Sequence, residues 1–455
     1  MRSPLNPLVG AAAIATALVV GAAFPAASFG ADTIWWANYT GSKVSYANLD
    51  GSGGGGDLNT TGATAPNSVA GVAIDAAAGK VYWANAGTGV ISYANLDGSG
   101  GGGDLNTSGA TVGAVRGLTI DPALGRLYWG NSGGIWYAKL DGSGGGSLDT
   151  GAASVQFPWG VAVDPADNRI YWANFNLSVT PTNKISYTAL DGTGGGVDLA
   201  VSGATVAQPK GVAIDEEAGR IYWTNPGAGS VLGKVAGADL DGGGGADFNV
   251  TGAGANASTT GPSLDPTANR VYWLGEDTNK LSFANLDGSG GVGDLSPGSG
   301  TINEPMFTAI LKAPSPAGDP SVSGGSTTGS TLSCSTGSWA ADLLGAFLSR
   351  APHSYGYRWS LDGSEVPGGT ASTLNASTPG AYRCQVTASN AAGTAGPQTS
   401  DPHLVSAAPP ALVTQSPTGS APAAAAPAKK KRKKCKKAKK RAAVSKKKCK
   451  KKQRQ

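Results

Sequence analysis

Hydrophobic and polar positions recur along this chain in a unit repeated every 43 to 51 residues, seen most clearly at residues 71–110. In that copy a brief apolar run (71–75) precedes a β-branched and aromatic run (80–85) and an alternating run (90–96). A weaker run (104–108) follows a stretch of glycines. Aromatic and β-branched residues suit a pleated, half-buried surface, and Gly and Asp clusters bound each run. The pattern predicts four short strands per unit.

Six copies of the unit can be counted on the tryptophan of the second predicted strand. That residue stands in Y-W-x-N or a close variant at Trp36, Trp83, Trp129, Trp172, Trp223 and Trp273. The third predicted strand ends in Leu-Asp-Gly or a close match, with the acid at Asp50, Asp97, Asp141, Asp191, Asp241 and Asp287. Repeated units of this length with four strands each are typical of the blades of an all-β propeller.

Alternating Y-W-x-N and L-D-G segments resemble the YWTD repeats of low-density-lipoprotein-receptor-type propellers, and the resemblance covers residues 34–312. It implies a six-bladed β-propeller at 32–312, but it says little about function, because such propellers host many activities. In one respect the chain departs from the family. The last Asp of the motif is replaced at Asn38, Asn85, Asn131, Asn174, Asn225 and Gly275. A hydrogen-bond network built on that carboxylate is therefore expected to be weakened or altered.

The first copy lacks its own first strand, and the missing segment follows the sixth copy. Residues 304–310 (EPMFTAI) align with 208–214 (QPKGVAI) and with 157–163 (FPWGVAV). We therefore expect the C-terminal segment to pair into the N-terminal blade. Closing the ring in this way removes exposed sheet edges.

The N-terminal residues 1–31 combine one early charge, an apolar run from 8 to 24 and a small-residue end. This pattern predicts a signal peptide cut near Gly30 or Ala31, with a retained anchor as the alternative. No second apolar stretch approaches membrane length. We expect a mature protein without a transmembrane span, secreted to the extracellular space or the cell envelope.

After a Pro-rich linker at 313–319, residues 320–405 change in composition. Cys334, Trp359 in Y-R-W, and Tyr382 two residues before Cys384 have the spacing found in immunoglobulin-like sandwiches. The segment resembles bacterial Ig-like repeats, and the resemblance implies a Cys334–Cys384 disulfide, which fits an exported protein. Such modules are mostly spacers or adhesive elements.

Residues 406–428 form an Ala/Pro-rich linker, and residues 429–455 contain 18 Lys or Arg and no acid. The remaining 17 basic residues and all 30 acids precede this tail, which leaves the body near −13 and the tail near +18. Such a tail is expected to be disordered and to bind polyanions in a salt-dependent way. The expected partners are anionic cell-wall polymers, acidic lipids or extracellular DNA. Alternatively, the tail folds back weakly on the acidic body. The sequence does not decide the state of Cys435 and Cys449.

The propeller segment contains neither His nor Cys, since His353, His403 and all four cysteines lie outside it. The usual zinc site, Ser-His pair and thiol nucleophile are therefore missing there. A general base would have to be a carboxylate or a tyrosine, and an acid-only calcium or magnesium site remains an alternative. We predict a protein that is not an enzyme, with no catalytic residue, no cofactor and no metal ligand.

Two repeated features imitate functional motifs. The glycine runs resemble calcium-binding β-helix repeats, but their spacing favours hairpin tips that need positive φ. The acids that close the first strands could form a catalytic ring, but each precedes a Lys or Arg by five residues. Turn formation plus an ion pair is therefore the favoured interpretation for Asp75, Asp121, Asp164, Asp215 and Asp265.

A binding face is predicted from register. The residues just before the first strands occupy equivalent ring positions: Ala70, Arg116, Trp159, Lys210, Thr260 and Met306. The fourth blade adds Phe157 and an enlarged loop at 175–183 that begins with Phe175. An aromatic residue between two basic ones suits an anionic or sugar-like ligand, so Arg116, Phe157, Trp159, Phe175 and Lys210 are the candidate binding residues. The alternative is that Trp159 only plugs the central channel.

Together these features predict a secreted, surface-associated protein in which the tail attaches to the envelope and the Ig-like module acts as a spacer. The propeller face would bind a protein or a glycan. Two alternatives stay open. One is a propeller enzyme of the lyase or lactone-hydrolase type that uses an acid-ligated divalent metal, and the other is a structural envelope protein without a specific ligand.

Overall fold

The computed structural model of the chain describes residues 31–175, 183–227, 233–254 and 258–410. Several sequence-based expectations fall outside these residues. They are the signal peptide up to residue 30, residues 176–182 of the enlarged loop, the linker from 411 onward, and the basic tail with Cys435 and Cys449.

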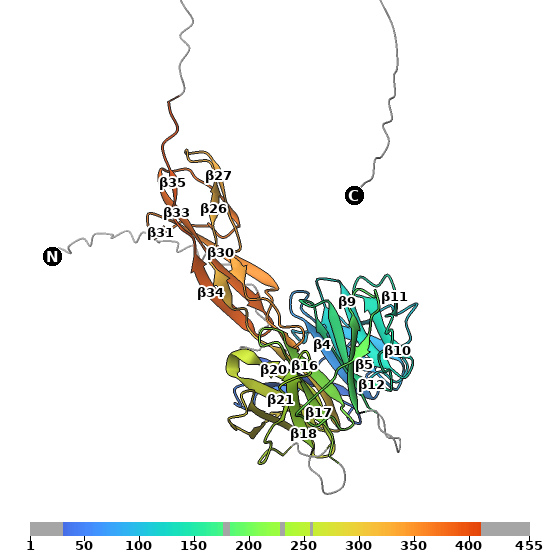
Figure 1. The fold of residues 1–455 in the computed structure, drawn as a ribbon. Coiled ribbons are helices and arrows are strands. Elements are labelled where there is room, and N and C mark those ends of the chain that lie inside the picture. The colour runs from blue at the N-terminus through green and yellow to red at the C-terminus, as the bar shows by residue number, and fades with distance from the viewer. Residues whose placement is uncertain (1–30, 176–182, 228–232, 255–257, 411–455) are drawn as a thin grey trace, which may run out of the picture. The chain divides into compact units, whose positions relative to one another are not determined.

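The described part of the chain is all-β, as predicted; its one helical element is a 3-10 turn, η1 (Pro266–Ala268) (Figure 1). Six sheets follow one another along residues 33–311. The first contains β1 (Thr33–Asn38), β2 (Lys43–Asn48), β3 (Gly55–Asp57) and β24 (Pro305–Leu311). The second contains β4 (Val69–Asp75), β5 (Lys80–Asn85), β6 (Val90–Asn95) and β7 (Gly103–Asp104). The third contains β8 (Leu118–Asp121), β9 (Arg126–Asn131), β10 (Gly134–Lys139) and β11 (Gly145–Ser147).

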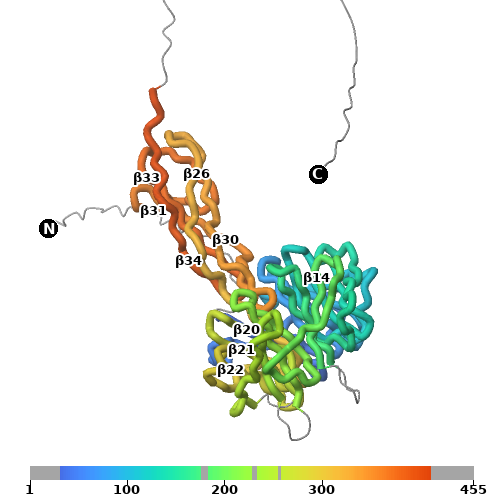
Figure 2. Tube along the Cα trace, viewed as in Figure 1, coloured from blue at the N-terminus to red at the C-terminus, as the bar shows by residue number. Residues whose placement is uncertain are grey.

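The remaining three sheets repeat this order. The fourth contains β12 (Pro158–Asp164), β13 (Arg169–Asn174), β14 (Lys184–Ala189) and β15 (Val197–Asp198). The fifth contains β16 (Gly211–Asp215), β17 (Arg220–Asn225), β18 (Lys234–Asp239) and β19 (Ala246–Asp247). The sixth contains β20 (Thr259–Asp265), β21 (Arg270–Gly275), β22 (Lys280–Asn285) and β23 (Gly293–Leu295). Figure 2 shows β20, β21 and β22 of the last sheet side by side.

The first strands of the sheets contact one another in a closed cycle of β4, β8, β12, β16, β20 and β24. The predicted closure is present, because β24 pairs antiparallel with β1, with Ile34 opposite Ile310 and Trp36 opposite Thr308. A segment from after the sixth copy thus completes the first sheet. No first strand of this cycle is left as an open edge.

The repeated tryptophans form the core of the sheets, and all six are fully buried. The indole Nε1 of Trp129 donates to the carbonyl oxygen of Thr111 at 2.8 Å. Trp36 makes the same bond, also at 2.8 Å, to Thr301, on the far side of the chain closure. The closure therefore reproduces a contact that the third, fourth and fifth sheets make within continuous sequence.

The motif asparagines retain a hydrogen-bond network in altered form, as the replacement of Asp by Asn predicts. In the second sheet, Asn85 Nδ2 donates to Ser92 Oγ at 2.9 Å, and that hydroxyl donates to Asp104 at 2.6 Å. The first and fourth sheets repeat this relay, ending on Asp57 and Asp198. Although partial burial opposes it, hydrogen bonds from lysine and hydroxyl groups lower the pKa of both acids to about 2. The carboxylate missing from the second strand is thus supplied by the fourth.

The acids that close the first strands form turns, as expected, with Asp75 accepting from the Ala78 amide at 2.9 Å. The expected ion pairs with the basic residue five positions on are wrong. None of the five pairs is bridged in the described structure. Instead, Lys80 Nζ lies 4.3 Å from the ring centroid of Tyr93, and Arg126 Cζ lies 4.4 Å from the ring centroid of Tyr137. In four of the five copies the basic side chain reaches across to an aromatic ring on the third strand, whose face attracts the cation. The exception is Arg220, which bridges Asp239 on that strand.

Residues 316–405 form further short sheets. Their strands are β25 (Pro316–Gly318), β26 (Val322–Gly324), β27 (Thr331–Cys334), β28 (Ser338–Trp339), β29 (Leu348–Ser349), β30 (Ser354–Leu361), β31 (Ser364–Glu365), β32 (Thr373–Asn375), β33 (Gly380–Asn390), β34 (Gly393–Thr399) and β35 (His403–Val405). Strand β25 lies within the expected linker 313–319 and pairs with β28. The Cys334–Cys384 disulfide is present and packs against the buried Trp359.

One excursion of this C-terminal part, residues 341–349, lies against the first strands of the sheets; we call it the plug segment. Its β29 pairs in parallel with β24. The carbonyl oxygens of Gly345 and Ala346 accept from the amides of Ile214 and Leu264 at 2.8 and 2.9 Å. Leu348 is fully buried in the same apolar cluster as Ile34 and Ile310. The plug segment therefore shares a core with the sheets, whereas the rest of the C-terminal part has a separate cluster around Trp359.

No helix within the described ranges has the length and hydrophobicity needed to cross a membrane. The disulfide is compatible with an extracellular protein.

Candidate functional site

The residue that begins the approach to each first strand has a left-handed backbone, and none of the six is glycine. The φ values lie between 45° and 53° at Ser68, Ala114, Phe157, Gln208, Ser258 and Glu304. Non-glycine residues adopt this conformation at a cost, and it is retained where the surrounding structure requires it. The bend recurs two residues before each of the predicted ring positions, so it places all six of them at the same level.

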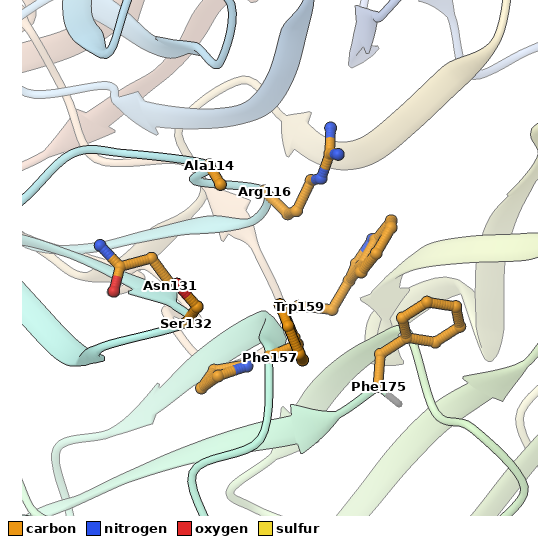
Figure 3. Close-up of a pocket in the computed structure, with 8 residues that line it drawn as sticks. Ala114, Arg116, Asn131, Ser132, Phe157, Trp159 and Phe175 are labelled. Carbon is orange, nitrogen blue, oxygen red and sulfur yellow. The ribbon is translucent and has the colours of Figure 1, made fainter. Parts of the chain in front are cut away.

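The structure brings the five candidate residues together. Arg116, Phe157, Trp159 and Phe175 line one pocket of about 420 Å³, together with Ala114, Asn131, Ser132 and Pro158 (Figure 3). Lys210 does not line this pocket, but its Nζ lies 5.2 Å from the Trp159 ring and 5.4 Å from the Phe175 ring. The alignment of the six copies therefore pointed to side chains that lie close together in the structure.

The aromatic rings of the pocket form a corner that holds the two cations. The rings of Trp159 and Phe175 meet edge to face with centroids 4.4 Å apart. The Arg116 guanidinium carbon lies 4.9 Å from the Trp159 ring and 4.7 Å from the Tyr39 ring. Figure 3 shows Trp159 between Arg116 and Phe175. Such contacts attract a cation to the ring face without neutralising its charge.

The two basic residues differ in their partners. Lys210 is buried, forms an ion pair with Glu276, and donates to Ser258 Oγ at 2.9 Å. Arg116 has no ion pair with any described residue, and its Nη1 is buried without a hydrogen-bond acceptor. The Nε1 of Trp159 is also buried without an acceptor. The site thus carries one uncompensated positive charge and two unsatisfied donors.

The central axis of the ring is filled by Phe307, which the sequence analysis did not identify. The equivalent position in the other five first strands is Gly71, Gly117, Gly160, Gly211 and Gly261. A Cβ on Gly117 or Gly160 would lie 2.9 or 2.8 Å from Phe307 Cε1, so the phenyl ring occupies the space that the glycines leave. Phe307 is 4% exposed, whereas Trp159 is only partly buried. Phe307, and not Trp159, therefore fills the central axis, and Trp159 lines the pocket.

Sequence reasoning missed Tyr39, Ser132 and Glu276, which contact or line the site. All three occupy one register position, directly after the last residue of the Y-W-x-N motif, and Phe175 is the fourth-copy equivalent. This position begins the loop between the second and third strands. Reading it in all six copies would have found these residues.

A second pocket of about 590 Å³ lies near the fifth and sixth sheets, but its charged groups are paired within the protein. Arg220 bridges Asp239 at 2.6 Å, and Asp247 bridges Lys234 at 2.7 Å. Asn269 donates to Asp287 at 2.8 Å. It therefore offers a ligand fewer unsatisfied groups than the Arg116 pocket does.

Glu216 lies beside the plug segment in a small space lined by Leu343 and Gly345. Burial and the negative charges of several aspartates, first Asp164 and Asp121, raise the pKa of Glu216 to about 7. Between the ordinary pKa of a glutamate and this value the folded state binds more protons than the unfolded state does. This group therefore makes the protein less stable as the pH rises toward 7.

Replacing Glu216 with glutamine is expected to stabilise the protein at pH 8 by about 1–2 kcal/mol, after reduction for the solvent exposure of the group. The stability difference from the unmodified protein should disappear near pH 4.5. Denaturant unfolding at a series of pH values measures both effects. Glutamine at the exposed neighbour Glu217 is the control, and equal effects of the two substitutions would contradict this assignment.

Within the part of the chain that the structure describes, no group of three or more His, Cys, Asp or Glu side chains is placed to hold a metal ion.

Comparison with known proteins places the chain by fold. No family model matches the sequence, and no curated protein matches it. A solved structure from the nidogen/laminin complex is 18% identical, with 61% of this chain and 98% of that chain covered and a TM-score of 0.48. A TolB described as putative, from Agrobacterium tumefaciens, is 13% identical over 58% of this chain and 88% of its own, with a TM-score of 0.39. These likenesses concern the propeller fold alone.

A gluconolactonase from Xanthomonas campestris is also similar, at 16% identity over 55% of this chain and 85% of its own, with a TM-score of 0.39. The expectation that this protein is not an enzyme is contradicted by such matches. That expectation rested on the lack of His and Cys in the propeller segment. A fold that also occurs in a lactonase does not by itself exclude catalysis, so the exclusion is withdrawn.

Proposed function

We propose that the protein is a secreted, surface-associated binding protein whose ligand, a protein or a glycan, binds at the Arg116 pocket. The observation that carries this proposal is the Arg116 guanidinium. It lies on aromatic rings at the wall of a pocket of about 420 Å³ and has no ion-pair partner within the described residues. Concave pockets with aromatic walls and a few converging polar groups are the usual form of ligand sites.

The scaffold of this proposal is a six-bladed propeller of the YWTD type. The closed cycle of first strands and the Trp36–Thr301 hydrogen bond across the closure support six blades. We further propose that residues 320–405 form an Ig-like module. The Cys334–Cys384 disulfide packed on Trp359 supports this, as does the Tyr382 hydroxyl donating to the Thr378 carbonyl at 2.8 Å.

The basic tail, residues 429–455, would attach the protein to anionic cell-wall polymers, acidic lipids or extracellular DNA. Its 18 basic residues without an acid support an attachment by counterion release, which does not depend on a shaped site. In this proposal the tail holds the protein at the envelope, and the pocket is left free to select the ligand.

Retention of the full chain on purified cell envelope, measured across a salt series, tests this division. Deleting residues 429–455 is expected to abolish the part of the retention that salt releases. Replacing Arg116 with Gln in the tail-deleted chain should abolish any salt-resistant retention. A tail deletion that leaves salt-sensitive retention unchanged would contradict the role of the tail. Salt-resistant retention that survives the Arg116 substitution would contradict the role of the pocket.

A further inference from the structure

We propose that the ligand group taken by the Arg116 pocket is a carboxylate carried on an apolar body, such as an aryl or alkyl carboxylate. This inference rests on the proposed function, that the propeller face binds a protein or a glycan, and it narrows that choice, because it favours a ligand that presents a carboxylate on an apolar surface over a glycan. Three observations carry it: the uncompensated charge, the unsatisfied donors, and the composition of the pocket wall.

The net charge of the site favours a ligand group that carries one negative charge. The carboxylate of Glu276 is paired with Lys210, so this pair contributes no net charge. Arg116 remains as a half-buried cation held by Tyr39 and Trp159. A single carboxylate would neutralise it, whereas a doubly charged phosphate monoester would leave one negative charge without a partner.

The donors of the site suit the same group. Arg116 Nη1 and Trp159 Nε1 are both buried without an acceptor. An unsatisfied buried donor carries a desolvation penalty that a bound acceptor removes. A carboxylate offers two oxygens with several lone pairs and accepts readily from a guanidinium, with short, charge-assisted hydrogen bonds.

The wall of the pocket argues against a hydroxyl-rich ligand. Eight lining residues are described, and five of them are apolar: Ala114, Phe157, Pro158, Trp159 and Phe175. The Asn131 amide is largely engaged within the protein, because its oxygen accepts from the Gly133 amide and Trp136 Nε1 and one N–H of its nitrogen donates to the Thr111 carbonyl. Among the described residues of the lining, Ser132 supplies the one side-chain hydroxyl. A sugar ring would therefore lose water from several hydroxyls without regaining partners.

Phe157 supports an apolar ligand body directly. It is a large aromatic residue with 58% of its surface exposed, and its backbone is held in the left-handed region. In the third sheet the equivalent position is Ala114, on the same pocket wall. An exposed ring fixed at the rim of an apolar pocket can cover a ligand body and bury apolar surface on binding.

The test is calorimetric titration of the full chain with phenylacetate, phenylacetamide and galacturonate at matched concentrations. Phenylacetate should bind one to one. The neutral amide should bind about tenfold more weakly or worse, because it lacks the charge. Galacturonate carries the same charge on a polar body, so it reports any binding of anions to the basic tail and should show no saturable site.

Substitutions locate the site. Arg116→Gln should weaken phenylacetate binding about tenfold or more, and Trp159→Phe, which keeps a ring but removes the Nε1 donor, should weaken it several-fold. Arg358→Gln, at an exposed arginine in the C-terminal part, is the matched control and should change nothing. Thermal unfolding of each variant shows whether the fold is kept.

Equal binding of phenylacetate by the Arg116→Gln variant, or no saturable binding by the unmodified chain, would overturn the proposal. Saturable, Arg116-dependent binding of galacturonate would replace it with an acidic-sugar site. If the carboxylates fail but salt-resistant envelope retention still depends on Arg116, the proposed function stands and only the ligand class is wrong. If that retention is also independent of Arg116, both fail.

Discussion

Replacing Phe307 with alanine is expected to lower the free energy of unfolding by about 3–5 kcal/mol. The phenyl ring fills the axis around which the first strands meet, and five of the six residues at this level are glycines. The glycines bring no side chain that can move into the space, so the cavity cannot collapse. Chemical denaturation of the full chain measures the loss.

The matched control is Phe157→Ala, which removes the same side chain from a position that is 58% exposed. It should change stability by less than about 0.5 kcal/mol. The complementary change, Gly160→Ala, should also destabilise, because its Cβ would lie 2.7 Å from Gly211 Cα and 2.8 Å from Phe307 Cε1. A Phe307→Ala variant as stable as Phe157→Ala would show that the axis does not depend on this ring.

Replacing Leu348 with alanine is expected to cost about 2–5 kcal/mol and to affect the propeller and the C-terminal part together. Leu348 is fully buried beside Ile34 and Ile310, although it belongs to the plug segment that interrupts the C-terminal sheets. The Phe347 carbonyl accepts from the Ile310 amide at 2.7 Å, which ties the same point to β24. Scanning calorimetry should show one transition for the unmodified chain.

Replacement of residues 343–348 by Gly and Ser should split this transition in two, since the shared core would be lost. Leu404→Ala provides the control, because that side chain is 70% exposed and lies outside the shared core. Two separate transitions in the unmodified protein would contradict the inferred coupling.

The position of the candidate site could be predicted from the sequence, because the repeats can be aligned residue by residue. Arg116, Trp159 and Lys210 share one position in aligned copies, and aligned strands in a closed ring bring such positions to one face. Register did not reveal which cation was free. Lys210 and Arg116 are equivalent in the alignment, yet among the described residues only Lys210 finds a carboxylate, because the neighbouring sixth sheet contributes Glu276.

The plug segment shows a second limit of the sequence. Residues 341–349 contain Leu343, Leu344, Phe347 and Leu348, which a reading of one module assigns to that module's own core. In the structure these side chains are buried against apolar residues of the first strands, which the six repeats do not cover by themselves. The local sequence pattern does not predict which other part of the protein a short apolar segment will pack against.

The sequence by itself determined the all-β class, the strand order within each copy, the closure of the first sheet by residues 305–311 and the Cys334–Cys384 pair. These follow from period, motif and turn chemistry, which act over a few residues or recur from copy to copy. Only the tertiary structure decided that Phe307 fills the axis, that Lys80 and Arg126 lie on tyrosine rings instead of pairing with acids, and that Arg116 has no counter-ion among the described residues. The tyrosine contacts form between neighbouring strands of one copy. The places of Phe307 and Arg116 depend instead on which side chains from distant copies meet once the ring has closed.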